Sequence, residues 1–218
     1  MGHELTFEFQ LIFNSNLMIT IIDYGLGNLE SIANMLKKLG YKSLISSNKK
    51  DIIKATKLIL PGVGSFDTGM NNLNQRGYTE VLQNKVIENK TPILGICLGM
   101  QLLANSSEEG MQTGLGWING RSVKFKHNSL KVPHMGWNNI KLLKQSTLFD
   151  PEDKFRKYYF VHSYHMICEE DEDALATSEY GHSFTAMVEK NNIYGAQFHP
   201  EKSHKYGMEI LNQFAKNT

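Results

Sequence analysis

Short apolar runs recur along the first half of the chain, and glycines follow each of them closely. The runs MITIID, KLIL and TPILGI are too short for core helices and lack a polar face, so they are typical of strands buried on both sides. Between the first two runs, residues 29–40 carry apolar side chains at helical spacing and end in Gly40, a typical C-cap residue. This alternation predicts an α/β fold in which helices cover both faces of a parallel sheet.

The second half of the chain is richer in strand-forming segments. GRSVKF, KYYFVHSYHMIC, LATSEY, FTAMVEK and IYGAQF have high β propensity, and turn-forming residues separate several of them. The last segment, residues 203–217, has the spacing of a closing helix, with inward positions at Met208, Ile210, Leu211 and Phe214. We therefore expect one domain with a mixed, mostly parallel sheet.

The first 17 residues differ in composition from the remainder of the chain. They contain Glu4 and Glu8 but no lysine or arginine, and their apolar stretch is too short for a signal peptide. We expect the domain to occupy residues 18–218 and residues 1–17 to form an N-terminal leader outside it. Aromatic and polar residues alternate within the leader, so both a free tail and a docked edge strand remain open interpretations.

Charge and cysteine content exclude several classes of protein. The 23 Lys and Arg residues nearly balance the 22 Asp and Glu residues, which argues against a nucleic-acid groove or a polybasic membrane surface. No apolar run approaches the roughly 20 residues of a membrane-spanning helix. Two cysteines, Cys97 and Cys168, do not make a disulfide framework, so we expect a reducing, cytoplasmic setting.

One of these cysteines lies in the segment GICLGMQ, directly after an apolar run. Gly-x-Cys-x-Gly has the form of a nucleophile elbow, in which a sharp strand-to-helix turn exposes the reactive side chain. The start of a helix favours the thiolate, and the backbone N–H of Leu98 is positioned to stabilise an oxyanion. We expect a second donor from the loop that contains Gly62 and Val63. The alternative is that Cys97 only fills the core, as buried cysteines commonly do.

A nucleophilic cysteine needs a base and a group that orients the base. In QFHPEKS, Gln197, His199 and Glu201 alternate as on a strand, so we expect them to share a face, with His199 as the base and Glu201 as its partner. His162 and His165 are three apart on an expected strand and should face opposite ways, which argues against a metal site. No complete dinucleotide-binding glycine motif follows the first strand. We expect neither a metal nor a cofactor.

Several motifs occur together in one order: IDYGLGN, LPGVGSF, GICLGMQLL, SSEEG, KVPHMGWN, YFVHSY and GAQFHPEKS. In this combination the chain, from Met18 to its C-terminus, resembles the class I (triad-type) glutamine amidotransferases. Within that family it is similar to the glutaminase subunits that supply ammonia to a cyclase in histidine biosynthesis.

The resemblance implies a flavodoxin-like sheet and a catalytic triad of Cys97, His199 and Glu201. Cys97 would form a glutamyl thioester and release ammonia, which would pass to a (β/α)8 cyclase subunit, where it would help to close an imidazole ring. By the same resemblance, the glutamine is surrounded by Gln101, Glu109, Ser163 and the Gly62–Val63 loop. Four further residues would lie at the interface with the cyclase: Asn28, Trp137, Tyr159 and Lys202.

Three other functions remain open from the sequence. The first is a related glutaminase that feeds a synthase for amidinated sugars. The second is a stand-alone cysteine hydrolase of γ-glutamyl or ester substrates. The third is a regulatory module without catalysis, although such a module would have no need of all three triad groups.

Overall fold

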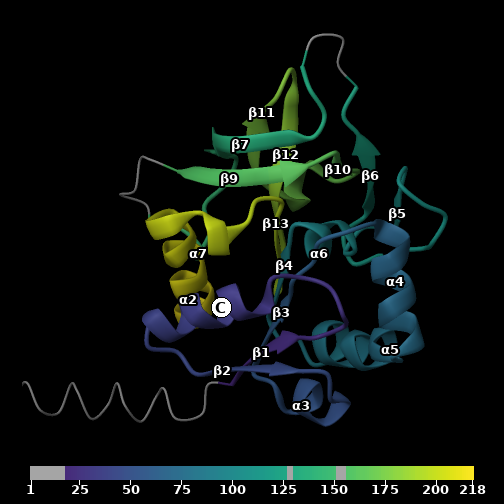
Figure 1. The fold of residues 1–218 in the computed structure, drawn as a ribbon, viewed down its shortest axis with the longest axis vertical. Coiled ribbons are helices and arrows are strands. Elements are labelled where there is room, and N and C mark those ends of the chain that lie inside the picture. The colour runs from purple at the N-terminus through teal and green to yellow at the C-terminus, as the bar shows by residue number, and fades with distance from the viewer. Residues whose placement is uncertain (1–17, 127–129, 151–155) are drawn as a thin grey trace, which may run out of the picture.

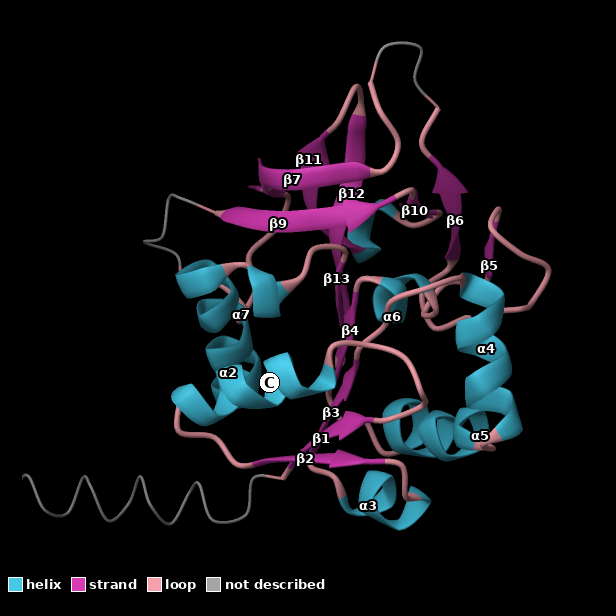
Figure 2. Cartoon of the chain, viewed as in Figure 1, coloured by secondary structure: helices cyan, strands magenta, loops and turns pink. Residues whose placement is uncertain are grey.

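The structure is a computed structural model that describes residues 18–126, 130–150 and 156–218. The expected leader, residues 1–17, lies outside the described residues. A central twisted sheet divides the molecule, with helices packed on two sides of its lower part in Figure 1. Strands alone form most of the upper part, as the colouring of Figure 2 shows.

Five parallel strands form the helix-covered part of the sheet, in the order β2-β1-β3-β4-β13. They are β1 (Ile19–Ile22), β2 (Ser43–Ser46), β3 (Lys57–Leu60), β4 (Ile93–Ile96) and β13 (Ile193–Ala196). Every residue of β1, β3, β4 and β13 is buried, as the uninterrupted apolar runs predicted. The order is that of the flavodoxin-like sheet, so the expected fold class is confirmed.

Helices cover both faces of this parallel part. On one face α2 (Leu29–Lys38) and α7 (His204–Asn217) pack over the sheet, and the other face carries α3 (Lys49–Lys54), α4 (Phe66–Gln75), α5 (Tyr78–Leu82), the π-helix η1 (Gln83–Glu88) and α6 (Leu98–Gln101). Alternate strand residues therefore enter two separate cores, because successive side chains of a strand point to opposite faces. Ile59, for example, belongs to the core with α2, whereas Leu58 and Leu60 belong to the other.

The expected helices are largely confirmed. Asn48 is the N-cap of α3, and its side chain accepts a hydrogen bond from the backbone N–H of Lys50. In α7, Ile210, Leu211 and Phe214 are buried as expected, whereas Met208 is only half-buried. At the end of α7, the ammonium group of Lys57 donates to the carbonyl oxygens of residues 214 and 215, at 2.8 Å each. Lys57 thereby supplies the donors that a helix C-terminus lacks.

Beyond β13 the sheet continues with antiparallel strands, so it is mixed as expected. β12 (Ser183–Lys190) pairs with β13, followed by β10 (Tyr164–Cys168), β6 (Gly120–Lys124) and the short β5 (Ser106–Ser107). β11 (Ala174–Glu179) pairs with β12, and β8 (Lys141–Leu142) pairs with β11. Two short 3-10 helices, η2 (Asp171–Asp173) and η3 (Pro200–Lys202), lie in the connections after β10 and β13.

A second, two-stranded sheet was not expected from the sequence. It consists of β7 (His134–Asn139) and β9 (Lys157–His162), which run antiparallel across the upper part of the molecule (Figure 2). The apolar segment KYYFVHSYHMIC, which resembled one continuous strand, is therefore divided at Ser163 between two sheets. Burial alternates along β9 and stops alternating at Ser163 and Tyr164, but the segment contains no glycine or proline from which the break could be read in the sequence.

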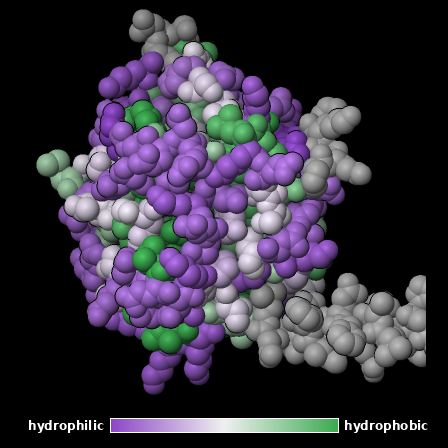
Figure 3. Space-filling view, turned by 180° about the vertical axis from the view of Figure 1, so that it is seen from behind, coloured by the Kyte–Doolittle hydropathy of each residue, from purple (hydrophilic) through white to green (hydrophobic). Residues whose placement is uncertain are grey.

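The surface is mainly polar. The face turned away from the view of Figure 1 is mostly hydrophilic, with several small and separate hydrophobic patches (Figure 3). Scattered patches of this kind are ordinary on soluble domains and do not by themselves mark an interface. Among the described residues, none of the helices combines the length and apolarity needed to cross a membrane.

Candidate active site

The turn after β4 holds Cys97 in a backbone conformation that few side chains adopt. Its φ is 54° and its ψ is −110°, a region that costs an L-residue about 1–3 kcal/mol. The flanking glycines are required by close packing: a Cβ on Gly99 would lie 1.9 Å from the carbonyl oxygen of Leu60, and one on Gly95 would lie 2.7 Å from the carbonyl oxygen of Gly99. The glycines therefore let the turn press against β3 and α6, which holds the strained cysteine in place.

The helix after Cys97 is shorter than expected. The strand-to-helix turn expected at GICLGMQ is present, but α6 comprises only Leu98–Gln101 and then passes into turns. Its dipole is correspondingly small, because few peptide groups are aligned. What remains useful is the backbone N–H of Leu98, the first residue of α6, which the helix itself leaves free. The structure therefore supports a hydrogen-bond donor at Leu98 more than a helix-dipole effect on the sulfur.

His199 and Glu201 form a buried pair beside Cys97. The His199 Nδ1 and Glu201 Oε1 atoms are 2.8 Å apart, and the two side chains are 2% and 1% exposed. The expected strand alternation is wrong, however, because β13 ends at Ala196 and Glu201 lies in the 3-10 helix η3. Pro200 begins this helix, and its tight turn brings the carboxylate back onto the imidazole. The expected pairing is thus present, produced by a turn and not by a strand.

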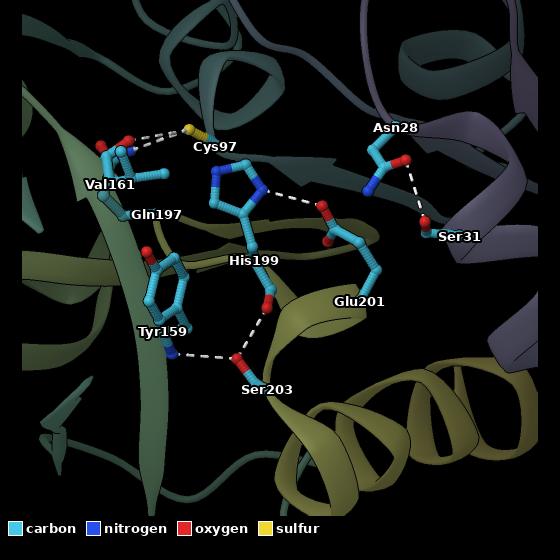
Figure 4. A network of polar contacts seen from close by, with 9 residues as sticks. All are labelled: Asn28, Ser31, Cys97, Tyr159, Val161, Gln197, His199, Glu201 and Ser203. Carbon is cyan, nitrogen blue, oxygen red and sulfur yellow. Dashed lines mark hydrogen bonds and ion pairs between the residues drawn. The ribbon is translucent and has the colours of Figure 1, made fainter. Parts of the chain in front are cut away.

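The imidazole of His199 lies between Cys97 and Glu201 (Figure 4). Burial alone would lower its pKa, but the interaction with Cys97 and the hydrogen bond with Glu201 outweigh that effect and raise the pKa to about 9. Nε2, on the Cys97 side of the ring, is buried and makes no hydrogen bond of ordinary geometry within the described residues. The ring is therefore held by Nδ1, and Nε2 is directed at the sulfur side, where a proton can pass between the imidazole and Cys97.

Backbone contacts fix His199 from the other side. Its N–H donates to the carbonyl oxygen of Tyr159 at 2.9 Å, and its own carbonyl oxygen accepts from the hydroxyl of Ser203 at 2.6 Å. The same hydroxyl accepts from the N–H of Tyr159 at 3.0 Å, which closes a small network (Figure 4). Ser203 was not predicted from the sequence, because its role depends on the approach of β9 to the loop after β13.

The loop of residues 61–64 borders the cysteine turn. The hydroxyl of Tyr24 donates to the carbonyl oxygen of Pro61 at 2.6 Å, and a Cβ on Gly62 would lie 2.7 Å from that hydroxyl and 2.8 Å from the backbone N of Gly99. Gly62 is therefore packed against α6, whereas Val63 is 41% exposed and faces the pocket. At Gly62 the loop is held by close packing, whereas at Val63 it is exposed, and this exposed part lies where the second oxyanion donor is expected.

A pocket of about 320 Å³ opens above Cys97 and His199. The three predicted substrate-binding residues, Gln101, Glu109 and Ser163, all line it, and Lys202 is at its rim. Glu109 also accepts a hydrogen bond from the backbone N–H of Phe66 at 2.7 Å, which anchors its carboxylate at the start of α4. The pocket thus brings the Glu109 carboxylate and the Lys202 ammonium group, from distant parts of the chain, close to Cys97.

Of the four predicted interface residues, only Lys202 lines this pocket. Trp137 is 40% exposed and stacks on His204, with ring centroids 5.5 Å apart, and its β9 neighbour Tyr159 meets it edge-on. Asn28 precedes α2 and accepts a hydrogen bond from the hydroxyl of Ser31 at 2.9 Å. In Figure 4 its amide is directed toward the carboxylate of Glu201. Tyr159 thus contacts both Trp137 and the backbone of His199, and Asn28 lies beside Glu201 in Figure 4.

A histidine cluster above the pocket corrects one expectation. His162 and His165 were expected to face opposite ways, but both rings pack on Phe125, with centroids 5.2 and 4.5 Å away. The break at Ser163 turns the chain between them. His134 and His182 contact the same phenylalanine, so four imidazoles surround one apolar ring. Within the described parts of the chain, no group of three or more ligating side chains has an arrangement suited to a metal ion.

Comparisons with known sequences agree with this geometry. The sequence model of the family Glutamine amidotransferase class-I matches residues 20–218. The chain is 56% identical over 200 residues to imidazole glycerol phosphate synthase subunit HisH 2 of Methanococcus maripaludis, covering 91% of this chain and 99% of the relative. It is 46% identical over 202 residues to subunit HisH of Leptospira interrogans, with coverage of 91% and 99%.

Solved structures show the same fold at lower identity. A putative GMP synthase component from Thermoplasma acidophilum superposes with a TM-score of 0.69 at 22% identity, covering 91% of this chain and 92% of that one. PurLQS from Thermotoga maritima gives a TM-score of 0.65 at 18% identity, with coverage of 91% and 97%. At these identities the likeness concerns the fold alone.

Proposed function

Because the chain belongs to the class I glutamine amidotransferases, we propose that it is the subunit of an imidazole glycerol phosphate synthase that hydrolyses glutamine to glutamate and ammonia. The observation that carries this proposal is the strained Cys97 beside a buried His199–Glu201 pair, at the base of a pocket lined by Gln101 and Glu109. The two relatives described above are named as subunits of this synthase, and the alignment with each covers 99% of its length.

The pocket has groups that suit the polar ends of glutamine. Both N–H bonds of the Gln101 amide have partners, the carbonyl oxygen of Tyr164 and Oε1 of Gln197, each at 3.0 Å. Its remaining polar atom is Oε1, an acceptor, and Glu109 has one oxygen not used by Phe66. Two acceptors at one end of the pocket fit a protonated α-amino group, and the Lys202 ammonium fits a carboxylate.

The chemistry begins with the Cys97 sulfur attacking the side-chain carbonyl carbon of glutamine while its proton passes to Nε2 of His199. The tetrahedral intermediate carries a negative oxygen, for which Leu98 N–H and a donor from the Gly62–Val63 peptide region provide hydrogen bonds. His199 then protonates the departing nitrogen, so ammonia leaves and a glutamyl thioester remains. Glu201 stabilises the imidazolium in each of these steps.

Hydrolysis of the thioester regenerates the cysteine. His199 takes a proton from water, the resulting hydroxide adds to the thioester carbonyl, and the sulfur leaves as glutamate forms. The proton balance is closed because His199 returns a proton to the sulfur. The ammonia passes to a (β/α)8 cyclase partner, which makes imidazole glycerol phosphate and AICAR in histidine biosynthesis. We place the assembled enzyme in the cytoplasm.

The partner docks on the surface of Trp137, Tyr159, Asn28 and Lys202, and its binding stimulates the glutaminase. Exposed tryptophan and a neighbouring cation are side chains that commonly contribute much of an interface's binding energy. The free end of the 61–64 loop, at Val63, lies next to the turn that must supply the oxyanion donor. A partner that docks beside the triad can therefore shift the nearby 61–64 loop, which must supply the second oxyanion donor.

The test is to mix the purified chain with the cyclase of the same organism's histidine pathway. We expect a stable complex, slow glutaminase activity in the free chain and strong stimulation in the complex with cyclase ligand. Trp137→Ala should weaken binding or uncouple the two activities, whereas Ile53→Ala, a change at an exposed residue of α3, should do neither. A free chain that already works at the full rate would instead indicate a stand-alone hydrolase. Stimulation only by a sugar-amidinating synthase would indicate the related pathway.

A further inference from the structure

Gln197 contacts the nucleophile although the chemistry described above does not use it. It follows β13 directly, its side chain is fully buried, and its Nε2 lies 3.8 Å from the Cys97 sulfur (Figure 4). Its Oε1 accepts a hydrogen bond from Nε2 of Gln101 at 3.0 Å. Gln197 does not line the pocket, so it is not placed to touch a bound substrate. The buried amide of Gln197 therefore contacts both Gln101, which lines the pocket, and the sulfur of Cys97.

The hydrogen-bond network fixes which end of the Gln197 amide faces the sulfur. The carbonyl oxygen of Tyr164 can only accept a hydrogen bond, so the atom of Gln101 that lies 3.0 Å from it must be the amide nitrogen. That nitrogen also lies 3.0 Å from the Gln197 side chain, whose facing atom must then be the oxygen. The Gln197 nitrogen is therefore directed at Cys97. The carbonyl oxygen of Tyr164 thus orients the Gln101 amide, and the Gln101 amide orients the Gln197 amide so that its N–H points at the sulfur.

The sulfur has contacts that favour opposite protonation states. The carbonyl oxygen of Val161, 4.0 Å from Sγ, can only accept, so it favours the thiol S–H. The N–H of Gln197 can only donate, so it favours the thiolate, which is the attacking form. Because Cys97 is 7% exposed, solvent contributes little to either state. The titratable groups that interact with the sulfur are His199 and Tyr24, and the donor from Gln197 adds a fixed, uncharged contribution that stabilises the thiolate.

We propose that Gln197 is a positioning residue for the nucleophile, and that the Gln101–Gln197 amide pair connects occupation of the pocket to the state of the Cys97 sulfur. This inference rests on the proposed function for its role in turnover. A cationic amino group on Oε1 of Gln101 polarises the Gln101 amide, which strengthens its hydrogen bond to Gln197 and, in turn, the donor offered to the sulfur. Glutamine binding thereby prepares the nucleophile.

The test measures alkylation of Cys97 by iodoacetamide as a function of pH, in the full chain, with peptide mass spectrometry to separate the two cysteines. Gln197→Met keeps the volume but removes the donor. We expect its alkylation rate at pH 7 to fall at least about tenfold, and the pH of half-maximal rate to rise by about one unit or more. Cys168 is an internal reference, because burial raises its pKa to about 11 and it does not touch Gln197.

A second variant and a control keep the test decisive. Gln197→Glu has the shape of glutamine, so it should fold, and its ionised carboxylate opposes the thiolate and should raise the half-maximal pH as well. Ser178→Ala removes a buried hydrogen bond, from its hydroxyl to the carbonyl of Asn139, far from the sulfur, and should leave the profile unchanged. An unchanged profile in both Gln197 variants, or a lower rate with the same half-maximal pH, would overturn the proposal.

Turnover supplies an independent reading. In the complex with the cyclase, Gln197→Met should lower kcat by about tenfold or more, because the donor acts on the sulfur, and should raise KM, because the coupling between pocket and sulfur is reciprocal. Alkylation needs neither glutamine nor a partner. If no partner elicits glutaminase activity, the proposed function fails, but the pH profile still decides whether Gln197 acts on Cys97.

Discussion

Two buried histidines, His199 beside Cys97 and His162 in the cluster around Phe125, have opposite acid–base behaviour. Their exposures are similarly low, 1% and 6%. Yet the pKa of His199 is raised to about 9, whereas burial lowers the pKa of His162 to about 3. The difference lies in their partners: His199 faces a carboxylate and a thiol, whereas His162 contacts a carbonyl oxygen at 2.8 Å and the ring of His134 at 3.0 Å.

The comparison shows what converts a buried imidazole into a base. Desolvation disfavours the charged form in both places and wins where the neighbours are neutral. The interaction with Cys97 and the Glu201 carboxylate at 2.8 Å together reverse the balance, because they favour the imidazolium by more than the cost of burial. Burial therefore favours the neutral imidazole at His134 and His162 in the cluster, whereas the partners of His199 favour its charged form.

The largest expected effect comes from removing the nucleophile. Cys97→Ala should abolish glutamine hydrolysis while leaving synthase activity with added ammonium salts intact, because the small side chain fits the strained turn. The same variant should lower the pKa of His199 by removing the interaction with the sulfur and leave that of His162 unchanged. Assays with glutamine and with ammonium, together with histidine NMR titration, measure both effects. Cys168→Ala is the matched control, and persistent hydrolysis in the Cys97 variant would refute the assignment.

Removing the acidic partner should make His199 resemble His162. Glu201→Gln keeps the shape and a hydrogen-bond acceptor but loses the charge, so the pKa of His199 should fall and kcat should drop by about 10³- to 10⁴-fold. Titration of His199 by NMR and steady-state kinetics with the partner check the two parts. Glu80→Gln, a change at an exposed residue of α5, should alter neither. If the pKa of His199 falls in Glu201→Gln while kcat stays normal, the raised pKa of His199 is not needed for catalysis.

The neutral histidine should make the fold sensitive to acid. The pKa of His162 is depressed in the folded state, so its contribution is fully present above pH 6.5 and is lost as the pH falls from 6.5 toward 3. Each pH unit below 6.5 lowers the free energy of unfolding by about 1.4 kcal/mol, so the loss at pH 5 is about 2 kcal/mol. Urea unfolding at pH 8 and pH 5 measures the change in the wild type and in the control His204→Gln, in both of which the lowered pKa of His134 adds to the loss and the raised pKa of His199 opposes it. The difference should be smaller in His162→Phe, and an equal loss in that variant would contradict the expectation.

The smallest effect should follow loss of the backbone anchor of His199. Ser203→Ala removes the hydrogen bonds that join Tyr159 N–H and the His199 carbonyl, each worth about 1 kcal/mol. We expect a modest loss of stability and about a fivefold lower kcat, which corresponds to about 1 kcal/mol in the barrier. The pKa of His199 should stay raised, because Glu201 and Cys97 remain. A collapse of activity comparable to that of Glu201→Gln would mean that position matters more than charge.

The sequence predicted the parallel part of the fold well because its determinants are local. A strand buried on both faces must be continuously apolar, and a helix between such strands must show its own spacing, as residues 29–40 do. The Gly95–Cys97–Gly99 pattern likewise follows from a close approach that excludes side chains. The antiparallel part was predicted less well, because residues 157–168 contain no glycine or proline that would mark the separation of β9 from β10 at Ser163.

What the sequence determined by itself is the set of reactive groups: a cysteine confined by glycines, and a histidine with a carboxylate two residues away. Both are short-range patterns, so backbone geometry alone limits where their side chains can go. The tertiary structure decided the remainder. Only the pairing of β13 with β4 brings Gln197 and His199 to Cys97, 100 residues earlier in the chain for Gln197. The charge of each buried histidine depends on such distant neighbours, because desolvation acts alike on both and only a partner supplied by the fold can reverse it.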